Sequence, residues 1–231
     1  VGSGAEVRNP EKQVVFTAPI DLDLCAEIYE TLQKYPVSLV FSTDDYDYRI
    51  GTEAEIEESF IRQLQVFHLD KDINEVQAKK EPLYEQIKKM TKKISDFEEL
   101  RAAGVPVYKI FLFSGDIPML KRIWAELEQN KDIAVASSFE TNLEITDVKA
   151  QKGPVLKQYI ESLGYKMDEV MVLGDSMNDY SMLSMDFGAT VAMENAVPEV
   201  KAAAGYVTKS NEDLGAAHAI YKILEQYGAG N

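Results

Sequence analysis

Two aspartates and an asparagine, Asp175, Asn178 and Asp179, lie within five consecutive positions of the chain. Directly before them, residues 170–173 are all apolar, which is typical of a buried strand in a parallel sheet, and Gly174 ends the run. In open α/β sheets, ligands bind at the carboxyl ends of the strands. Carboxylates this close repel each other unless a cation lies between them, and hard oxygen ligands at this density favour Mg²⁺.

The same stretch also suits a simpler interpretation. A helical pattern follows it, with Tyr180, Met182 and Leu183 at suitable spacing, and either Asn178 or Asp179 could cap that helix. Residues 170–179 by themselves support a metal site and a capped polar turn about equally, so the surrounding elements are needed to choose between them.

Charge excludes some classes of partner. Twenty-four basic against 39 acidic residues give a net charge of −15 and a pI near 4.6. General nucleic-acid binding requires a basic surface, so we expect no nucleic-acid partner. An anionic substrate would have to be met by locally placed cations or by a metal ion.

Length and cysteine content narrow the class further. The 231 residues suit one large domain or two small ones, and 45% hydrophobic residues are ordinary for a chain with a packed core. The single cysteine, Cys25, cannot form an intramolecular disulfide and suits a reducing compartment. No apolar run is long enough for a membrane span, and residues 1–4 do not resemble a signal peptide. We therefore expect a cytoplasmic protein without a membrane partner.

Residues 14–146 combine hairpins with strand–helix–strand units, which indicates an α+β module. Asp21 or Asp23 can cap a first helix, and Thr52-Glu53-Ala54-Glu55 resembles a capping box. A second capping box is expected at Ser95-Asp96-Phe97-Glu98, with its helix ending at Gly104. The expected strands are 13–18, 37–41, 46–50, 106–113, 133–137 and 143–146, and the expected helices are 21–34, one from 52, 95–104 and 116–129.

A lysine-rich segment lies between Asn74 and Lys93. One interpretation is a basic face offered to a phosphorylated ligand. The alternative, which we favour, is a solvated helix face, because glutamates at 75, 81 and 85 are interleaved with the lysines. The lysines concerned are Lys79, Lys80, Lys88, Lys89, Lys92 and Lys93.

A few other polar residues have weaker claims to a function. The acidic turn at residues 44–46 could overhang a binding site, but a solvated turn is the simpler interpretation. His68 and His218, the two histidines, are too far apart in this arrangement to form a site. We expect both to be surface or packing residues, and we expect Cys25 to be buried and inert.

After Lys149 short strands alternate with short helices, which is typical of a parallel, doubly wound sheet. A helix is expected from Gly153 to Leu163, with Gly164 at its C-cap. The later elements are strands at 170–173, 190–193 and 206–207 and helices to about 185, at 198–203 and at 213–226.

With these elements in place, the C-terminal third resembles the haloacid dehalogenase superfamily of phosphatases. More narrowly, it resembles the Cof-type branch, whose Rossmann-like core carries a large inserted α/β cap. Four blocks carry the resemblance, in the expected order and on the expected elements. They are Lys152-Gly153, Gly174-Asp175-Ser176-Met177-Asn178-Asp179, Val191-Ala192-Met193-Glu194-Asn195-Ala196 and Tyr206-Val207-Thr208-Lys209-Ser210-Asn211-Glu212-Asp213.

The resemblance implies a domain plan and a chemistry. Residues 1–13 would lead into the cap, 14–147 would form the cap, and 148–231 would form the C-terminal part of the core. An aspartate nucleophile would attack a phosphate monoester of a small metabolite such as a sugar phosphate, and the aspartyl-phosphate would then be hydrolysed. Mg²⁺ and a lysine would neutralise the transferring group.

The same resemblance assigns roles by motif position. Asp175 and Asp179 would hold Mg²⁺ directly or through water. Asn178 would orient the loop or contact the phosphate. Lys152 would bind the phosphate and weaken the repulsion between the nucleophile and the carboxylates.

The chain departs from the family at its beginning. The family starts with an apolar strand and Asp-x-Asp-Gly-Thr, which carries the nucleophile, and no such motif occurs here. Asp21-Leu22-Asp23-Leu24 has the acid spacing but opens a helix. Ser3-Gly4-Ala5-Glu6-Val7 instead resembles the family's segment leading into the cap. We therefore expect roughly one βαβ unit, about 30 residues or more, to precede this sequence in the natural protein, and the chain alone to be inactive.

The sequence leaves two other functions open. A protein that keeps the Mg²⁺ and phosphate loop without a nucleophile would bind phosphorylated ligands or regulate a partner. A sugar-phosphate mutase or phosphotransferase would use the same architecture to move the phosphoryl group between substrates. The residues indicate neither the particular substrate nor the oligomeric state.

Overall fold

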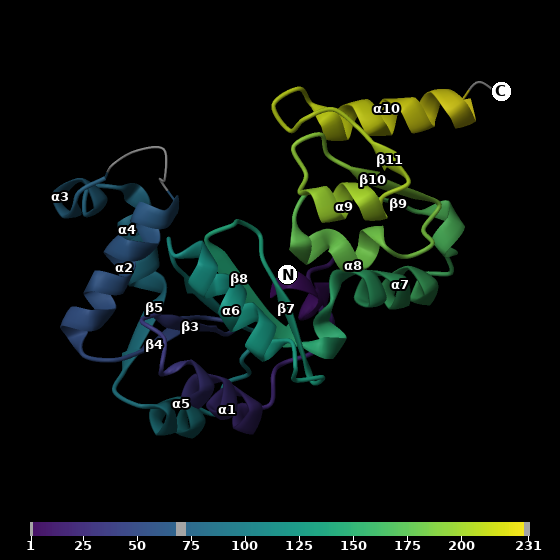
Figure 1. Ribbon diagram of the computed structural model, residues 1–231. Coiled ribbons are helices and arrows are strands. Elements are labelled where there is room, and N and C mark those ends of the chain that lie inside the picture. Colours follow the sequence, from purple (N-terminus) through teal and green to yellow (C-terminus); the bar gives the residue numbers. More distant parts are fainter. Residues whose placement is uncertain (1, 68–72, 229–231) are drawn as a thin grey trace. The chain divides into compact units, whose positions relative to one another are not determined.

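The computed structural model describes residues 2–67 and 73–228, and it is shown in Figure 1. The chain divides into two compact units, Val1–Ala150 and Gln151–Asn231. His68 lies outside the described residues. Among the described residues, no helix is both long enough and apolar enough to cross a bilayer.

The first unit contains helices on a mixed sheet, together with a short antiparallel pair near its beginning. Its strands are β1 (Glu6–Arg8), β2 (Val14–Thr17), β3 (Leu39–Ser42), β4 (Asp47–Ile50), β5 (Thr91–Ile94), β6 (Lys109–Phe113), β7 (Ile133–Ala136) and β8 (Asn142–Asp147). Its helices are α1 (Leu22–Leu32), α2 (Glu53–Phe67), α3 (Glu75–Ala78), α4 (Pro82–Met90), α5 (Phe97–Ala103) and α6 (Ile117–Leu127).

Six strands form the main sheet of this unit, in the order β5-β4-β3-β6-β8-β7. All neighbours are antiparallel except β4 and β5, which are parallel. Helices α1, α5 and α6 cover one face, where alternate strand residues such as Phe41, Ile110 and Ile145 are fully buried. Each such side chain contributes roughly 1.5–3 kcal/mol of burial free energy, so this face is the main core of the unit.

Local signals in the sequence explain several helix ends. The Asp21 carboxylate accepts hydrogen bonds from the Asp23 and Leu24 amides and begins α1. Thr52 and Glu55 exchange hydrogen bonds in the capping box expected at the start of α2. The second capping box was placed wrongly by one residue. Asp96, whose carboxylate accepts from the Glu99 amide at 3.0 Å, is the N-cap of α5.

Helix α2 packs near the second face of the sheet, and α3 and α4 pack on α2. Val66 of α2 is buried with Val40 and Phe113 of the sheet, and Phe60 is buried in a cluster with Tyr84 of α4. Helices α3 and α4 therefore form an outer layer on α2.

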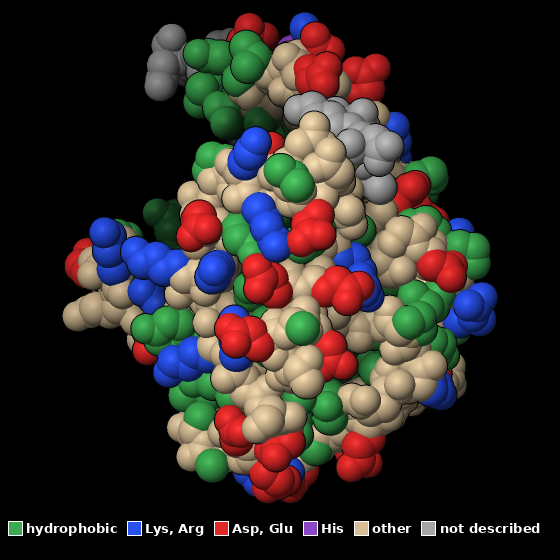
Figure 2. All heavy atoms as spheres, turned by 90° about the vertical axis from the view of Figure 1, so that its left-hand side faces the viewer, with side chains coloured by type: hydrophobic (Ala, Val, Ile, Leu, Met, Phe, Trp, Pro, Cys, Tyr) green, Lys and Arg blue, Asp and Glu red, His purple; other side chains and the backbone are tan. Residues whose placement is uncertain are grey.

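The lysine-rich segment is only partly helical. Lys92 and Lys93 lie on β5, so the expectation of one continuous helix face is wrong for them. Lys93 pairs with Glu53 at 2.7 Å and Lys79 with Glu75 at 2.8 Å. Figure 2 shows this side of the molecule, where basic and acidic side chains are interspersed. These contacts favour a solvated surface over a phosphate-binding face.

A buried carboxylate lies on the second face of the sheet. Glu144 of β8 is 5% exposed and pairs with Lys109 of β6 at 3.3 Å, and it accepts hydrogen bonds from Ser3 and Ser138. Burial raises the pKa of Glu144, but the Lys109 charge and these hydrogen bonds together lower it by more. The pKa of Glu144 is therefore below its ordinary value.

We expect Glu144→Gln to lower the free energy of unfolding by about 1–3 kcal/mol at pH 7. A carboxyl whose pKa is lowered by folding stabilises the protein above its unfolded-state pKa, near 4.5, and loses that contribution as the pH falls through the folded-state value. The difference between wild type and variant should therefore shrink below about pH 4.5. Urea unfolding at a series of pH values measures it, and a difference that stays constant down to pH 3 would contradict this account.

The second unit contains a three-stranded parallel sheet, in the order β11-β10-β9. Its helices are α7 (Lys152–Ser162), α8 (Tyr180–Leu183), α9 (Pro198–Ala203) and α10 (Gly215–Gly228), and its strands are β9 (Met171–Gly174), β10 (Ala189–Ala192) and β11 (Tyr206–Val207). This alternation confirms the expected α/β class. The C-cap of α7 is Leu163, one residue before the expected Gly164. Gly164 follows with a φ of 85°, and the Tyr165 and Gly164 amides donate to the Ile160 and Glu161 carbonyls.

The two minor candidates that the structure describes have packing roles. Cys25 is fully buried, as expected. Burial raises the pKa of its thiol to about 12, so the thiol is unreactive at neutral pH. His218 lies on α10, with its Nδ1 atom 3.1 Å from the Thr208 hydroxyl.

Candidate functional site

The carboxyl ends of the parallel strands bring three loops to one edge of the second sheet. Residues 175–179 follow β9, residues 193–197 follow β10, and residues 208–213 follow β11. Backbone hydrogen bonds join the first two loops, from Met193 to the Gly174 carbonyl at 3.0 Å and from Val197 to the Asp175 carbonyl at 2.9 Å. The polar residues of the first loop therefore lie where parallel sheets place ligand sites.

Asp179 is the best-connected residue of this edge. It is 7% exposed, and its Oδ1 atom accepts a hydrogen bond from Lys152 Nζ at 2.5 Å. Its Oδ2 atom accepts from the Asp175 amide at 3.1 Å and, more weakly, from the Ser176 amide at 3.5 Å. A buried carboxylate needs such partners, and here one cation and two amides supply them.

This geometry also bears on the alternative of a capped polar turn. The Asp179 carboxylate makes no capping hydrogen bond to α8, but it accepts from the Ser176 amide in a capping box at the start of the short 3-10 turn Met177–Asp179. The Asn178 side chain is half-buried and has no hydrogen-bond partner among the described residues. The capped turn of the alternative interpretation is therefore partly present, and the same carboxylate also binds Lys152.

Lys152 owes its position to the glycine that follows it. It is the first residue of α7, and the Gly153 amide donates to the Ser181 hydroxyl of α8 at 3.1 Å. A Cβ atom at position 153 would lie 2.3 Å from the Ser181 carbonyl oxygen. Only glycine allows the two helices to approach this closely, and this contact holds the Lys152 side chain beside Asp179.

Asp175 is the more open of the two carboxylates. It is half-buried, and its Oδ2 atom accepts a hydrogen bond from Asn195 Nδ2 at 3.3 Å. The Asn195 Oδ1 atom accepts in turn from the Asn211 amide at 3.0 Å. Asn195 thus links all three loops, a role that the sequence analysis missed although the residue stands in one of the quoted blocks. A polar residue two positions after a predicted strand was the available signal.

The donor set suits a magnesium ion held mainly by Asp175. Mg²⁺ binds proteins through one or two carboxylates and completes its octahedron with water or phosphate oxygens. Asp175 keeps one carboxylate oxygen without a described partner, whereas both Asp179 oxygens already accept donors. No cluster of three or more acidic, histidine or cysteine residues occurs among the residues described, so solvent or substrate would supply the other ligands.

The aspartates at 21 and 23 have structural roles, as expected. Asp21 caps α1, and Asp23 pairs with Arg101 at 2.6 Å. The acid spacing that they share with a catalytic motif therefore has a local explanation.

The carboxyl edge of the parallel sheet thus carries a lysine, two aspartates and an asparagine, and comparison with known families identifies the class of protein. The family model for haloacid dehalogenase-like hydrolases matches residues 2–220. The chain therefore belongs to the haloacid dehalogenase-like hydrolase family, as its motifs indicated.

Several of the relatives are named as phosphatases. The chain is 38% identical over 133 residues to phosphatase YwpJ of Bacillus subtilis, an alignment that covers 57% of this chain and 46% of that protein. It is 33% identical over 118 residues to pyridoxal phosphate phosphatase YbhA of Escherichia coli, covering 51% of this chain and 43% of the relative. The chain spans about half the length of the curated relatives it matches.

Solved structures confirm the fold. A haloacid dehalogenase-like hydrolase from Bacillus subtilis superposes with a TM-score of 0.77 at 29% identity, covering 94% of this chain and 75% of that one. A sugar phosphatase of subclass IIB, the Cof-type branch, gives a TM-score of 0.67 at 21% identity, covering 98% and 74%. The expected α/β fold class is therefore correct.

Proposed function

We propose that this protein is a Mg²⁺-dependent phosphatase of small phosphorylated metabolites. The observation that carries the proposal is the Lys152–Asp179 ion pair beside the half-buried Asp175, at the carboxyl edge of a parallel sheet. Membership of a hydrolase family and the names of the relatives support it, since one of them acts on pyridoxal phosphate and another on a phosphorylated ribitylamino-uracil.

Each residue has a proposed part in the reaction. Asp175 would hold Mg²⁺, which supplies positive charge to the oxygens of the transferring phosphoryl group. Asp179 orients the Lys152 ammonium and fixes the backbone amides of the loop. Lys152 offers its remaining N–H donors to the phosphate, and Asn178 offers its free amide to the same group. In a chain of net charge −15, this local cation gives an anionic substrate a place to bind.

A direct test uses the whole natural protein and a panel of phosphate monoesters that includes sugar phosphates and pyridoxal phosphate. We expect release of inorganic phosphate that requires Mg²⁺ and stops when the metal is chelated. Binding of the monoesters without phosphate release would favour a binding protein. Transfer of the phosphoryl group to an added acceptor sugar would favour a phosphotransferase.

We expect Lys152→Met to lower kcat/KM by about 10²–10³-fold, because a charge that stabilises the transferring phosphoryl group is lost. The matched control is Lys157→Met on the same helix, where the lysine is half-buried and pairs only loosely with Glu161 at 3.9 Å. Steady-state kinetics on both variants measures the difference. Equal activities would remove Lys152 from the proposed site.

A further inference from the structure

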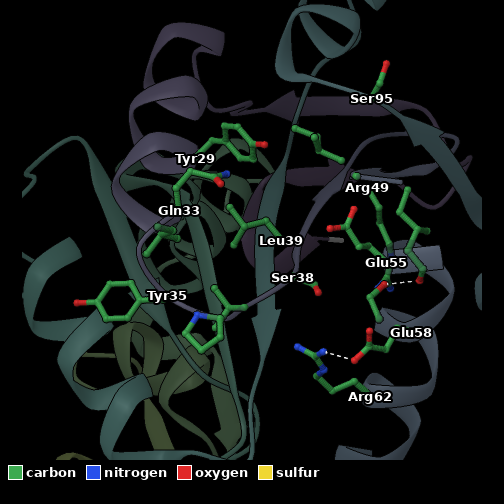
Figure 3. A pocket seen from close by; sticks show the side chains of 17 residues that line it. Tyr29, Gln33, Tyr35, Ser38, Leu39, Arg49, Glu55, Glu58, Arg62 and Ser95 are labelled. Atoms are coloured by element: carbon green, nitrogen blue, oxygen red, sulfur yellow. Dashed lines mark hydrogen bonds and ion pairs between the residues drawn. The ribbon is translucent and has the colours of Figure 1, made fainter. Parts of the chain in front are cut away.

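The first unit contains a cavity of about 480 Å³ that the proposed reaction does not use. It lies between the end of α1, the strands β3 and β4, and one face of α2, as Figure 3 shows. Tyr29, Gln33 and Leu39 lie on one side of it, and Arg49 and Glu55 lie on the other. Cavities of this volume are typical of sites for small organic ligands.

Arg49 is the unusual residue of the cavity wall. It is 2% exposed, and its guanidinium donates hydrogen bonds to the Ser59 hydroxyl at 2.8 Å and to the Gln63 side chain. It lies 4.9 Å from the centre of the Phe60 ring. Its Nε donor has no hydrogen-bond partner within the described part of the chain, and no carboxylate there forms an ion pair with it.

A buried arginine without an ion pair is costly for the protein. Burial lowers the pKa of Arg49 to about 10 against the opposing effect of the Asp47 charge, and the side chain stays charged at neutral pH. The desolvated charge and the unsatisfied donor both oppose folding unless an anion or another acceptor compensates them. The Ser59 hydroxyl, the Gln63 amide and the Phe60 ring compensate only part of the cost of burying the charge.

The carboxylates near the cavity are already engaged. Glu58 pairs with Arg62 at 2.7 Å, and Glu55 accepts hydrogen bonds from the Thr52 amide and hydroxyl at 2.8 and 2.7 Å. Neither of them forms an ion pair with Arg49, and both would repel a ligand that carries two negative charges. This balance favours a ligand with a single negative charge over a phosphate dianion.

Apolar side chains line part of the wall, beside polar ones such as Gln33 and Ser38. Leu32, Leu39, Ile50 and Ile56 line the cavity, together with Tyr29. We propose that the cavity binds a small monocarboxylate with an apolar body, whose carboxylate lies toward Arg49 and whose body packs on these side chains. Because Arg49 is almost completely buried, its charge acts on the ligand through a wall of low dielectric constant, where the attraction is stronger than in water.

This site shares no residue with Lys152, Asp175, Asn178 or Asp179, so it stands or falls independently of the proposed phosphatase activity. Isothermal titration calorimetry of the whole protein tests it with three probes: 3-phenylpropionate, 4-methylpentanoate and octanoate. Each is compared with its own neutral amide, and inorganic phosphate is titrated separately. We expect at least one carboxylate to bind with a Kd of about 1 mM or below, and its amide at least about tenfold more weakly.

Variants then place the bound probe. Arg49→Met should weaken carboxylate binding at least about tenfold and leave amide binding unchanged, whereas the exposed control Arg122→Met should change neither. Should Arg49→Met fail to fold, Ser38→Phe fills the cavity without touching the arginine and should abolish binding.

Several results would overturn the proposal. They are no saturable binding of any carboxylate up to about 10 mM, equal affinity for acid and amide, binding unaffected by both cavity variants, or tighter binding of inorganic phosphate than of every carboxylate.

Discussion

Replacing Asp175 by Asn should lower kcat by about 10³-fold or more and leave the fold intact. The carboxylate is half-buried at the carboxyl end of β9, and one of its oxygens accepts only from Asn195 at 3.3 Å. It is therefore the side chain best placed to hold a magnesium ion, and an amide in its place would lose the charge while keeping the shape. The melting temperature should change little, because Asp175 forms no ion pair among the described residues.

The matched control for this variant is Asp186→Asn, an exposed aspartate of the same unit. Phosphate release at a series of Mg²⁺ concentrations separates two effects, a loss of metal affinity and a loss of rate at saturating metal. We expect both in Asp175→Asn and neither in Asp186→Asn. An Asp175→Asn enzyme with normal activity and normal Mg²⁺ dependence would contradict the proposed metal site.

Gly174→Ala should damage both stability and activity. A Cβ atom at position 174 would lie 2.4 Å from Cβ and 2.8 Å from Cγ of Asp179, closer than any real contact. Asp179 is buried and held by Lys152 and by two amides, so it cannot move aside without breaking these bonds. Overpacking of this kind costs about 1–3 kcal/mol of unfolding free energy. We expect a loss of kcat/KM of about tenfold or more as the Lys152–Asp179 pair is displaced.

Gly115→Ala is the matched control, since a Cβ atom there meets nothing within 4 Å. Urea unfolding and steady-state kinetics on both variants test the prediction. An alanine at 174 that leaves stability and activity unchanged would show that the loop relaxes easily, and it would argue against a rigid site.

Much of the secondary structure could be predicted because its signals are local. Pro198 begins α9, Gly164 ends the α7 turn with a positive φ, and Asp21 caps α1, so each boundary depends on residues within a few positions. The parallel sheet of the second unit follows from its alternating short strands and helices. The domain boundaries, the role of the turn at 44–46 and the roles of the site residues stay predictions.

Where the sequence analysis was wrong, a neighbour in space had outweighed the local pattern. Lys92 was assigned to a helix face, but it lies on β5, which pairs in parallel with β4. The Lys92 ammonium lies 4.4 Å from the centre of the Tyr46 ring. Asp96 replaced Ser95 as the cap of α5 because its carboxylate meets the Glu99 amide. The Asp96 partner is local, whereas the strand and ring that meet Lys92 come from residues more than 40 positions away.

The spacing of Asp175, Asn178 and Asp179 after an apolar run, together with Lys152-Gly153 upstream, was enough to indicate the family and a phosphate and metal site at a sheet edge. Only the tertiary structure decided that Lys152 pairs with Asp179, which leaves Asp175 as the more open carboxylate. It alone showed that Arg49 is buried with one donor, Nε, that has no partner among the described residues. The physical reason is that strand, cap and turn signals act between chain neighbours, whereas the partner of a charge is set by packing between segments distant in sequence.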